Sequence, residues 1–155
     1  MNEAIFTLPD AATVATGLMV GVYFIYAVAI MPGLRRLDAS TFVAAFQATD
    51  RAIINPIFLA AFVAPTALCG IGAFTERSEP GYRWIVVAFV LNAATVVITM
   101  VINVPLNDVL KARGEVTGPD ATDARQAFRE ARWVAWNWSR TIASLAALVC
   151  LTLVG

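Results

Sequence analysis

Four long apolar segments are separated by short polar stretches along the chain. They cover residues 11–31, 56–74, 84–104 and 134–154. Each is long enough for a helix that crosses the hydrocarbon core of a bilayer, which needs about 20 apolar residues. Every acidic residue lies outside these segments, and Arg140 is the only basic residue inside one. The pattern predicts an all-α membrane protein with a bundle of four transmembrane helices, in which residues 1–155 form a single integral membrane domain.

Two further segments are predicted to be helical without crossing the membrane. Residues 38–54 carry an apolar face at helical spacing, and Asp38 is a suitable N-cap. The face consists of Phe42, Phe46, Thr49 and Ile53. We expect a short interfacial helix on the cytoplasmic side, or else an extension of the second span. Residues 123–132 are charged and helix-prone, so they are expected to run directly into the fourth span as its N-terminal extension.

The distribution of basic residues predicts the orientation of the bundle. The loops after the first and third spans together carry eight basic residues, whereas the loop after the second span carries only Arg77 and Arg83. Because cytoplasmic loops are enriched in Lys and Arg, the side with eight is expected to be cytoplasmic. The residues before the first span are acidic rather than basic, which favours an uncleaved helix over a signal peptide. We therefore expect a multi-pass protein of the plasma membrane with both termini external.

Composition agrees with membrane insertion and narrows the chemistry. Apolar residues make up 59% of the chain and charged residues 14%, whereas soluble domains average about 45–50% and about 25%. The 11 basic and 11 acidic residues balance, and nothing in their pattern indicates nucleic-acid binding. The chain has no histidine, so it lacks the usual general base and the commonest zinc ligand. Its two cysteines form no CxxC motif, and no metal site is predicted.

Two membrane spans carry polar residues at helical spacing. The stripe on the third span consists of Asn92, Thr95, Thr99 and Asn103, and the stripe on the fourth consists of Trp133, Asn137, Arg140 and Ser144. Asn107 continues the first stripe, although Pro105 is expected to bend or end that helix first. Lipid offers these groups no hydrogen-bond partners, so both stripes are expected to face inward and to contact each other.

Arg140 is the most unusual of these residues because of its depth. Only fifteen residues follow it, none of them charged; as a helix they span about 22 Å, and the hydrocarbon core is about 30 Å thick. An ionisable side chain at that depth is costly and is by default a candidate functional residue. Its guanidinium is expected to reach toward Asn103 in a polar pocket, with snorkelling to the cytoplasmic interface as the alternative. Trp133, Trp136 and Trp138 fit either an interfacial belt or the walls of a site for a flat aromatic ligand.

Several small features of the spans have a packing interpretation beside a functional one. Gly17 and Gly21 form a GxxxG motif, for which packing within the bundle is favoured over homo-oligomer formation. Pro65 is expected to kink the second span, which either adjusts packing or shapes a cavity. Cys69 and Cys150 lie in apolar stretches, where two small buried side chains are favoured over a disulfide.

Two motifs in the second half of the chain resemble a known family. They are Asn103-Val-Pro-Leu-Asn107 and Trp133-x-x-Trp136-Asn137-x-x-Arg140, and weaker matches are Gly21-x-Tyr23-Phe24, Phe46-Gln47 and Asn55-Pro56. On four membrane helices, this set is similar to the anthrone oxygenase-like family of small integral membrane proteins. The resemblance covers nearly the whole chain and implies a four-helix membrane fold.

What the resemblance implies for function is a cofactor-independent membrane oxygenase. Members of that family are associated with the oxidation of anthrones to anthraquinones by O2, without an evident metal or flavin. For this chain it implies a hydrophobic phenolic or polycyclic, anthrone-like substrate in a pocket between the third and fourth spans. The family's proposed catalytic histidines have no counterpart here, and the nearest carboxylates by sequence, Asp50 and Asp108, are not clearly in the pocket.

The candidate site residues follow from the polar stripes and the motifs. Arg140 would stabilise a substrate anion, asparagines would bond to substrate oxygens, and tryptophans would stack on its rings. The candidate catalytic residues are Arg140, Asn103 and Asn137, and the candidate substrate-binding residues are Asn107, Trp133, Trp136, Asn55, Gln47 and Thr99. No cofactor is expected, and the expected partners are the bilayer and a hydrophobic small molecule or lipid. Two other functions stay open: a quinone- or lipid-binding protein without chemistry, and a structural partner of another membrane protein.

Overall fold

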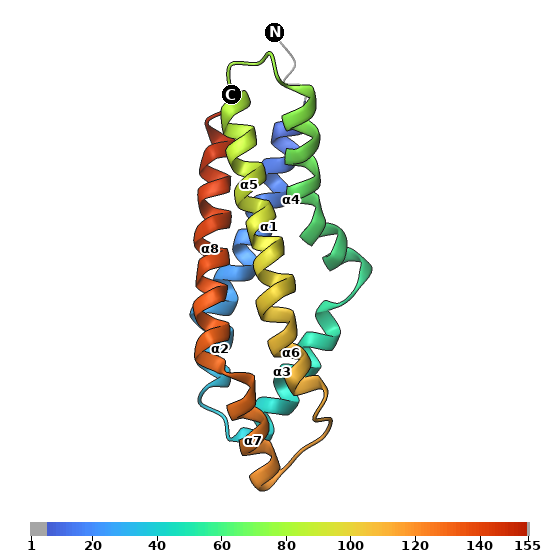
Figure 1. Ribbon diagram of the computed structural model, residues 1–155, viewed down its shortest axis with the longest axis vertical. Coiled ribbons are helices and arrows are strands. Elements are labelled where there is room, and N and C mark those ends of the chain that lie inside the picture. The colour runs from blue at the N-terminus through green and yellow to red at the C-terminus, as the bar shows by residue number, and fades with distance from the viewer. Residues whose placement is uncertain (1–5, 155) are drawn as a thin grey trace.

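The computed structural model describes residues 6–154 as a series of helices that run along one long axis (Figure 1). In chain order the elements are α1 (Leu8–Ile25), η1 (Tyr26–Ile30), α2 (Met31–Leu34), α3 (Ala39–Ile53), α4 (Pro56–Thr75), α5 (Tyr82–Ile98), η2 (Thr99–Asn103), α6 (Val104–Lys111), α7 (Gly118–Phe128) and α8 (Glu130–Thr152). The two ends of the described chain lie at the same end of the bundle, and α7 lies at the other. The prediction of an all-α fold is confirmed for the described residues.

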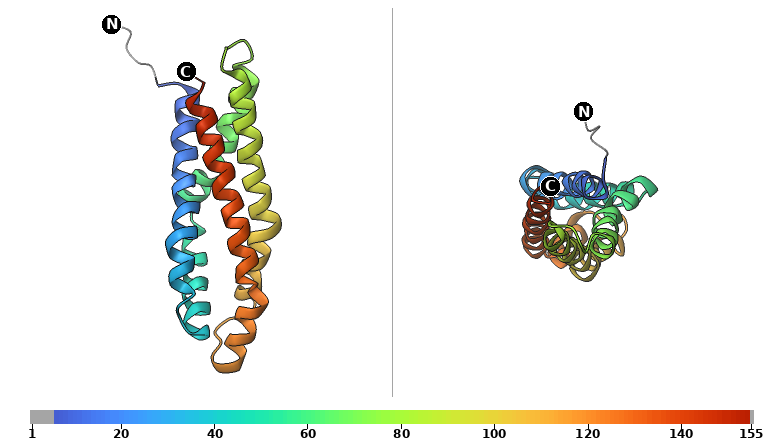
Figure 2. Two further views of the ribbon diagram at one scale, coloured as in Figure 1. Left: turned by 90° about the vertical axis from the view of Figure 1, so that its left-hand side faces the viewer. Right: turned by 90° about the horizontal axis from the view of Figure 1, so that it is seen from above.

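Four helical stretches are long and apolar enough to cross a membrane, so this is a multi-pass membrane protein by length and composition. The stretches are Leu8–Leu34, Pro56–Thr75, Tyr82–Lys111 and Gly118–Thr152, and each contains most of one predicted span. The first packs against the second and the fourth, and the third also packs against both of these. Figure 2 shows these helices from above, along the long axis. Most residues of the two polar stripes are buried in the interior between the helices.

Two of the membrane helices contain a π-helical turn that is followed by a proline. In η1 the N–H of Met31 donates to the carbonyl of Tyr26, and in η2 the N–H of Val104 donates to the carbonyl of Thr99. Pro32 and Pro105 come directly after these wider turns. A proline crowds the preceding helical turn and lacks an N–H, and a widened turn accommodates both effects. The third span therefore continues through Pro105 to Lys111, where the sequence predicted a bend or an end.

The α3 helix forms the charged end of the bundle together with α6 and α7. Its N-cap is Asp38, whose carboxylate accepts from the backbone N–H of Thr41 at 3.1 Å. Hydrogen bonds from Ser40 and Thr41 hold the pKa of Asp38 well below its ordinary value. The chain leaves the helical conformation at Ile54, so α3 is a separate helix and not an extension of α4.

The predicted extension of the fourth span is present but is not continuous with it. Helix α7 begins at Gly118 and ends at Phe128, and Arg129 then adopts the left-handed conformation, with φ 54° and ψ 54°. Arg125 on α7 pairs across this break with Glu130, the first residue of α8, at 3.2 Å. It also donates to the carbonyl oxygens of Leu37 and Arg35 at 2.9 and 3.0 Å. Local helix propensity therefore predicted the helical residues of this segment but not the sharp change of direction between them.

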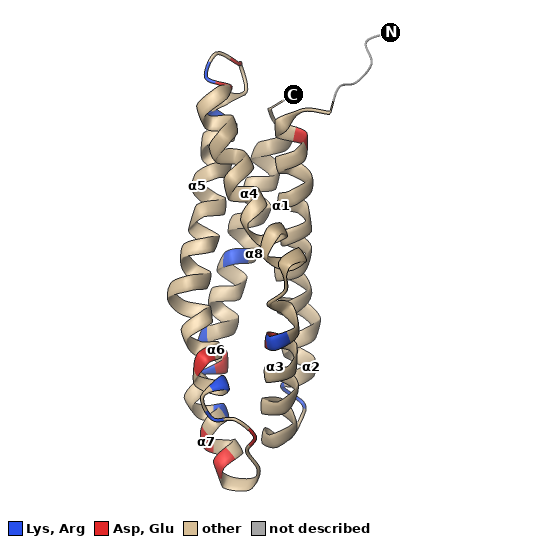
Figure 3. Ribbon diagram, turned by 90° about the vertical axis from the view of Figure 1, so that its right-hand side faces the viewer, with Lys and Arg blue, Asp and Glu red and all other residues tan. Residues whose placement is uncertain are grey.

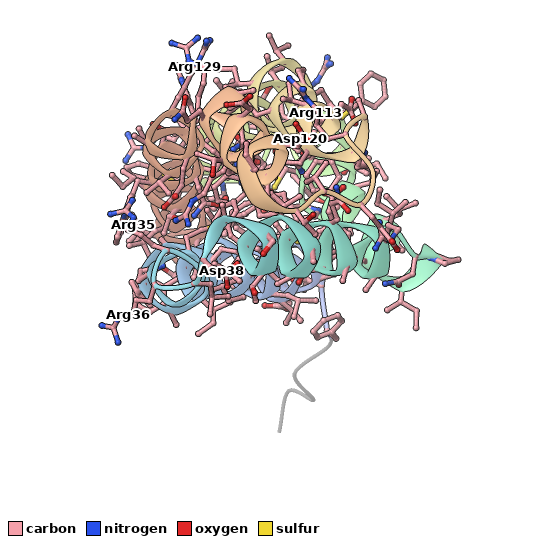
Figure 4. All side chains as sticks on the ribbon, turned by 90° about the horizontal axis from the view of Figure 1, so that it is seen from below. Arg35, Arg36, Asp38, Arg113, Asp120 and Arg129 are labelled. Atoms are coloured by element: carbon pink, nitrogen blue, oxygen red, sulfur yellow. The ribbon has the colours of Figure 1, made fainter. Side chains whose placement is uncertain are left out.

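Replacing Arg129 by glycine is expected to stabilise the protein by about 0.5–1 kcal/mol, because glycine adopts positive φ without a steric penalty. The Arg129 side chain is exposed and points away from the bundle (Figure 4), so its removal breaks no packing contact. Chemical unfolding in detergent, followed by circular dichroism, measures the change. The matched control is Arg132→Gly, also exposed but inside α8, which is expected to destabilise the helix by about 1 kcal/mol. A loss of stability in both variants would contradict the expectation.

Of the two glycines of the GxxxG motif, only Gly17 packs within the bundle. A Cβ atom at Gly17 would lie 3.9 Å from the side chain of Leu148 on α8, whereas Gly21 is exposed and a Cβ atom there would meet nothing within 4 Å. Cys69 and Cys150 are buried free cysteines in one apolar cluster. Pro65 is buried within an unbroken α4, and the N-terminal part of that helix lies farther from the bundle than its C-terminal part (Figure 1). This N-terminal part of α4 contributes Phe58, Leu59 and Phe62 to the wall of a cavity.

Candidate functional site

A cavity of about 230 Å³ occupies the part of the bundle interior next to α3. Its walls come from α1 and η1, from α3, from the N-terminal half of α4, from η2 and α6, and from α8. Aromatic side chains form much of the apolar surface, among them Phe46, Phe58 and Phe62. Both π-helical turns contribute to the walls, through Tyr26 from η1 and Thr99 and Asn103 from η2. The widened turns therefore lie where polar side chains meet the cavity, as π turns at functional sites often do.

Arg140 lies in the cavity wall and is held by two polar side chains. Its Nη1 donates to Thr99 Oγ1 at 2.9 Å, and its Nη2 donates to Asn137 Oδ1 at 2.8 Å. The guanidinium carbon lies 4.7 Å from the ring centre of Tyr23 and 5.6 Å from that of Trp133. The side chain is 6% exposed, so it points inward and does not snorkel. Spans three and four thus meet through Arg140 as predicted, although its partner on span three is Thr99 and not Asn103.

The positive charge of Arg140 has no carboxylate partner within the part of the chain that the structure describes. In Figure 3 charged residues gather at the ends of the bundle, and the blue stretch half-way along α8 is separate from them. The guanidinium has five N–H donors, and its buried Nε has no hydrogen-bond partner among the described residues. The faces of Tyr23 and Trp133 offset part of the cost through cation–π contact. A buried cation with free donors on a cavity wall favours a ligand that carries negative charge.

Asn137 connects Arg140 to the first helix. Its Nδ2 donates to the carbonyl oxygen of Tyr23 at 3.0 Å, in the last turn before η1. This bond directs Oδ1 of the same amide toward the guanidinium. Asn137 is 1% exposed, so its orientation is maintained by the surrounding packing as well. The residue is suited to orienting Arg140.

A hydrogen-bonded chain continues around the cavity from Trp133. The indole Nε1 of Trp133 donates to Asn107 Oδ1 at 2.8 Å, and Asn107 Nδ2 donates to Asp50 Oδ1 at 2.7 Å. Asn103 Nδ2 donates to the carbonyl oxygen of Trp133 at 3.3 Å, whereas Asn103 Oδ1 is buried and has no hydrogen-bond partner among the residues that the structure describes. Asn103 and Arg140, both in the cavity wall, therefore each keep a polar atom whose hydrogen-bonding capacity is unused.

Asp50 lies in the cavity wall. The sequence alone did not show whether its carboxylate is in the pocket. It is 8% exposed, and its Oδ2 is buried without a hydrogen-bond partner. Lys111 Nζ lies 3.4 Å from this oxygen, close enough for an ion pair but not in hydrogen-bonding geometry. Lys111 also pairs with Asp108 at 2.6 Å; the side chain of Asp108 is 57% exposed and lies outside the cavity wall. One feature of the sequence indicated that Asp50 faces the interior. It follows Phe46 by four residues and so lies on the apolar face of the helix.

Six of the nine residues predicted from the sequence line the cavity. They are Arg140, Asn103, Asn137, Asn107, Trp133 and Thr99. The structure adds Tyr23 and Tyr26, of which only the first belonged to a motif, and that motif was weak. The six predicted residues lie in the bundle interior because a polar residue on a membrane helix finds hydrogen-bond partners there and not in lipid.

The remaining three predicted residues do not line the cavity. The Nε2 of Gln47 donates to the carbonyl oxygens of Leu110 and Gly114, so this amide satisfies the C-terminal end of α6. Asn55 is the N-cap of α4 and accepts from the N–H of Phe58 at 3.0 Å. Trp136 is partly buried elsewhere on α8. Gln47 and Asn55 therefore satisfy backbone groups at helix ends.

The acidic residues of the site are too few to bind a metal by themselves. In residues 6–154, no three His, Cys, Asp or Glu side chains lie close enough together to hold a metal ion. The site residues with free polar atoms are Arg140, Asn103 and Asp50. They suit an organic ligand that has both an acceptor or anionic oxygen and a donor.

Comparison with known proteins agrees with the motifs. The family model described as anthrone oxygenase matches residues 42–150, more than two thirds of the chain. The chain belongs to the anthrone oxygenase family. The match extends from α3 into α8 and so includes Asp50 and Arg140, but Tyr23 and Tyr26 lie before it. No curated protein and no solved structure matches the chain.

Proposed function

We propose that this protein oxidises a hydrophobic, anthrone-like phenolic substrate to a quinone with O2, and that the reaction needs no metal or flavin. The single observation that carries the proposal is the buried Arg140, which has no carboxylate partner within residues 6–154 and lies in the wall of a cavity partly lined by aromatic side chains. Membership of the anthrone oxygenase family supports it. In the overall reaction a methylene carbon becomes a carbonyl, one O2 is consumed and one water is released.

Arg140 would act by stabilising the anion from which electrons pass to O2. Removal of a proton from an anthrone gives a delocalised enolate, and its negative charge rests largely on oxygen. Free N–H donors of Arg140 would bind this oxygen in a water-poor site, where a preoriented charge is most effective. Thr99 and Asn137 already hold the guanidinium, so little reorganisation is required.

The other cavity residues would orient the substrate. Asn103 Oδ1 is a free acceptor that suits a phenolic hydroxyl of the ligand. The aromatic walls from α3 and α4, with Trp133 from α8, suit a flat polycyclic ring system. Such a substrate partitions into the bilayer, and a cavity within a membrane bundle can receive it from there.

We also propose the orientation expected from the loops, with the end formed by α3 and α7 on the cytoplasmic side of the plasma membrane. Basic side chains surround this end, and Figure 4 shows Arg35, Arg36 and Arg129 projecting outward from it. The positive-inside rule supports this assignment. Both termini would then be external.

The test is turnover by the purified protein in nanodiscs, with an anthrone as substrate and isotopically labelled O2. We expect quinone formation faster than spontaneous autoxidation, with one labelled oxygen in the new carbonyl group. A rate equal to that of empty nanodiscs would exclude the oxygenase function. Mass spectrometry of the product distinguishes oxygen derived from O2 from oxygen derived from water.

The second candidate is a protein that binds a quinone or lipid without chemistry. The same cavity supports it, and it needs no base. Retention of a hydroxyanthraquinone at one molecule per protein, without turnover of the anthrone, would favour this function. A purely structural role is less well supported, because Arg140 bonds to side chains on a cavity wall and not to helix carbonyls.

A further inference from the structure

One buried carboxylate of the cavity is not used by the function proposed above. Asp50 is 8% exposed and lines the cavity that Arg140 also lines. Its Oδ1 accepts from Asn107, which fixes the orientation of the carboxylate. Its Oδ2 is buried and accepts no hydrogen bond from residues 6–154, although Lys111 Nζ lies 3.4 Å away. Buried polar atoms normally take part in hydrogen bonds, so this oxygen has unused accepting capacity.

The surroundings of Asp50 hold its carboxylate in one orientation beside the cavity. Lys111 Nζ lies 3.4 Å from Oδ2 and forms an ion pair with the carboxylate. Asn107, which holds Oδ1, also accepts from the indole of Trp133, and the guanidinium of Arg140 lies over that indole ring at 5.6 Å. The base and the anion-binding group are therefore connected through one chain of contacts. The chain has no histidine to take the role instead.

We infer that Asp50 is the base of the proposed oxygenation, with Asn107 and Lys111 as positioning residues. The inference rests on the proposed function and deepens it by assigning the proton transfers. Asp50 Oδ2 takes a proton from the methylene carbon of the substrate, and the electron pair of the broken C–H bond remains on the substrate as the enolate. Arg140 binds the enolate oxygen.

The remaining steps return Asp50 to its starting state. The enolate transfers electrons to O2 and forms a C–O bond, which gives a peroxide anion on the former methylene carbon. This anion takes the proton back from Asp50. Asp50 then removes the second proton from that carbon, the C=O bond forms, and the O–O bond breaks. The departing hydroxide takes the proton from Asp50 and leaves as water, so the single carboxylate serves both proton removals.

The decisive experiment separates proton removal from oxidation by excluding O2. Wild-type protein in nanodiscs is mixed anaerobically with an anthrone in deuterated water, and exchange of the methylene hydrogens is followed by mass spectrometry. The wild type is expected to accelerate this exchange over empty nanodiscs. Asp50→Asn is expected to reduce both the exchange and kcat by about 10²–10⁴-fold, the usual contribution of a general base. Its affinity for a hydroxyanthraquinone product is expected to stay unchanged, because the amide keeps the shape of the side chain.

Asp108→Asn is the matched control. It removes the other carboxylate that pairs with Lys111, by the same chemical change, at a largely exposed position outside the cavity. Exchange and turnover are expected to remain at the wild-type level. An equal loss in both variants would mean that the lysine and not the Asp50 carboxylate is responsible, and would overturn the assignment.

Failure of this inference can be told apart from failure of the proposed function. If Asp50→Asn exchanges and oxidises as fast as wild type, Asp50 is not the base, and the oxygenase function stands. If the wild type neither accelerates exchange nor forms quinone, both proposals are overturned. Should Asp50→Asn not retain product binding, Asp50→Ser removes the carboxylate with a smaller polar group and is judged by the same two outcomes.

Discussion

Replacement of Arg140 by glutamine is expected to lower kcat/KM for an anthrone by about 10²–10³-fold, the usual effect of removing a donor that stabilises a developing anion. Glutamine keeps a polar amide in the site but has no charge to offer the enolate. The loss is expected mainly in kcat, because the charge matters most where negative charge develops. Steady-state quinone formation, followed by absorbance, measures it.

The same substitution is expected to leave the melting temperature nearly unchanged. The buried guanidinium carries a desolvation cost that no carboxylate offsets within the described residues, so its removal relieves a cost while it also breaks two hydrogen bonds. Arg132→Gln is the matched control, because Arg132 is exposed on the same helix. The Arg132→Gln variant should keep the wild-type kcat/KM and the wild-type melting temperature. If Arg140→Gln unfolds the protein but the folded fraction keeps full turnover, Arg140 has a structural role and the proposed function loses its main support.

Truncation of Phe128 to alanine is expected to lower the free energy of unfolding by about 3–5 kcal/mol, the usual range for a fully buried phenylalanine. Phe128 is 0% exposed and ends α7. Its ring centre lies 5.8 Å from that of Phe42, 4.7 Å from that of Phe46 and 6.3 Å from that of Trp133. The cavity left behind would loosen the contact between α3 and α7 and remove a support of Trp133. Chemical unfolding in detergent, monitored by tryptophan fluorescence, measures the loss.

Phe74→Ala serves as the control for the Phe128 experiment. Phe74 is 72% exposed near the C-terminal end of α4, so the same truncation creates no internal cavity. Its effect on the free energy of unfolding is expected to be small. A comparable loss in the two variants would indicate a general effect of removing aromatic area from detergent contact, and would contradict the role assigned to the aromatic cluster of α3, α7 and Trp133.

The amino-acid sequence was sufficient for the membrane spans and for the inward-facing residues. Span length follows from bilayer thickness, and the spacing of Asn103, Asn137 and Arg140 follows from the helical period. Both are local properties, so they could be predicted without knowing how the helices pack. The family followed from the same residues, because they make up its motifs.

Two interruptions of the helices could not be predicted, because the local sequence indicates them only weakly. The π-helical turn before Pro105 allows the third span to continue, and the left-handed Arg129 divides α7 from α8. The surrounding packing selects such conformations against local preference. The roles of Gln47 and Asn55 were also not evident from local sequence. Their residue type and position suited ligand binding, but in the structure each forms a hydrogen bond to the backbone at a helix end.

The site itself was decided by tertiary structure. Asp50 meets Asn107 across 57 positions of sequence, and Arg140 meets Thr99 across 41. Such contacts depend on the tilt and axial register of whole helices, which sum many small packing energies and are not encoded in any one segment. The sequence by itself determined which side chains turn away from lipid. Only the packed bundle determined that Arg140, which has no carboxylate partner in the described part of the chain, lines the same cavity as the carboxylate of Asp50.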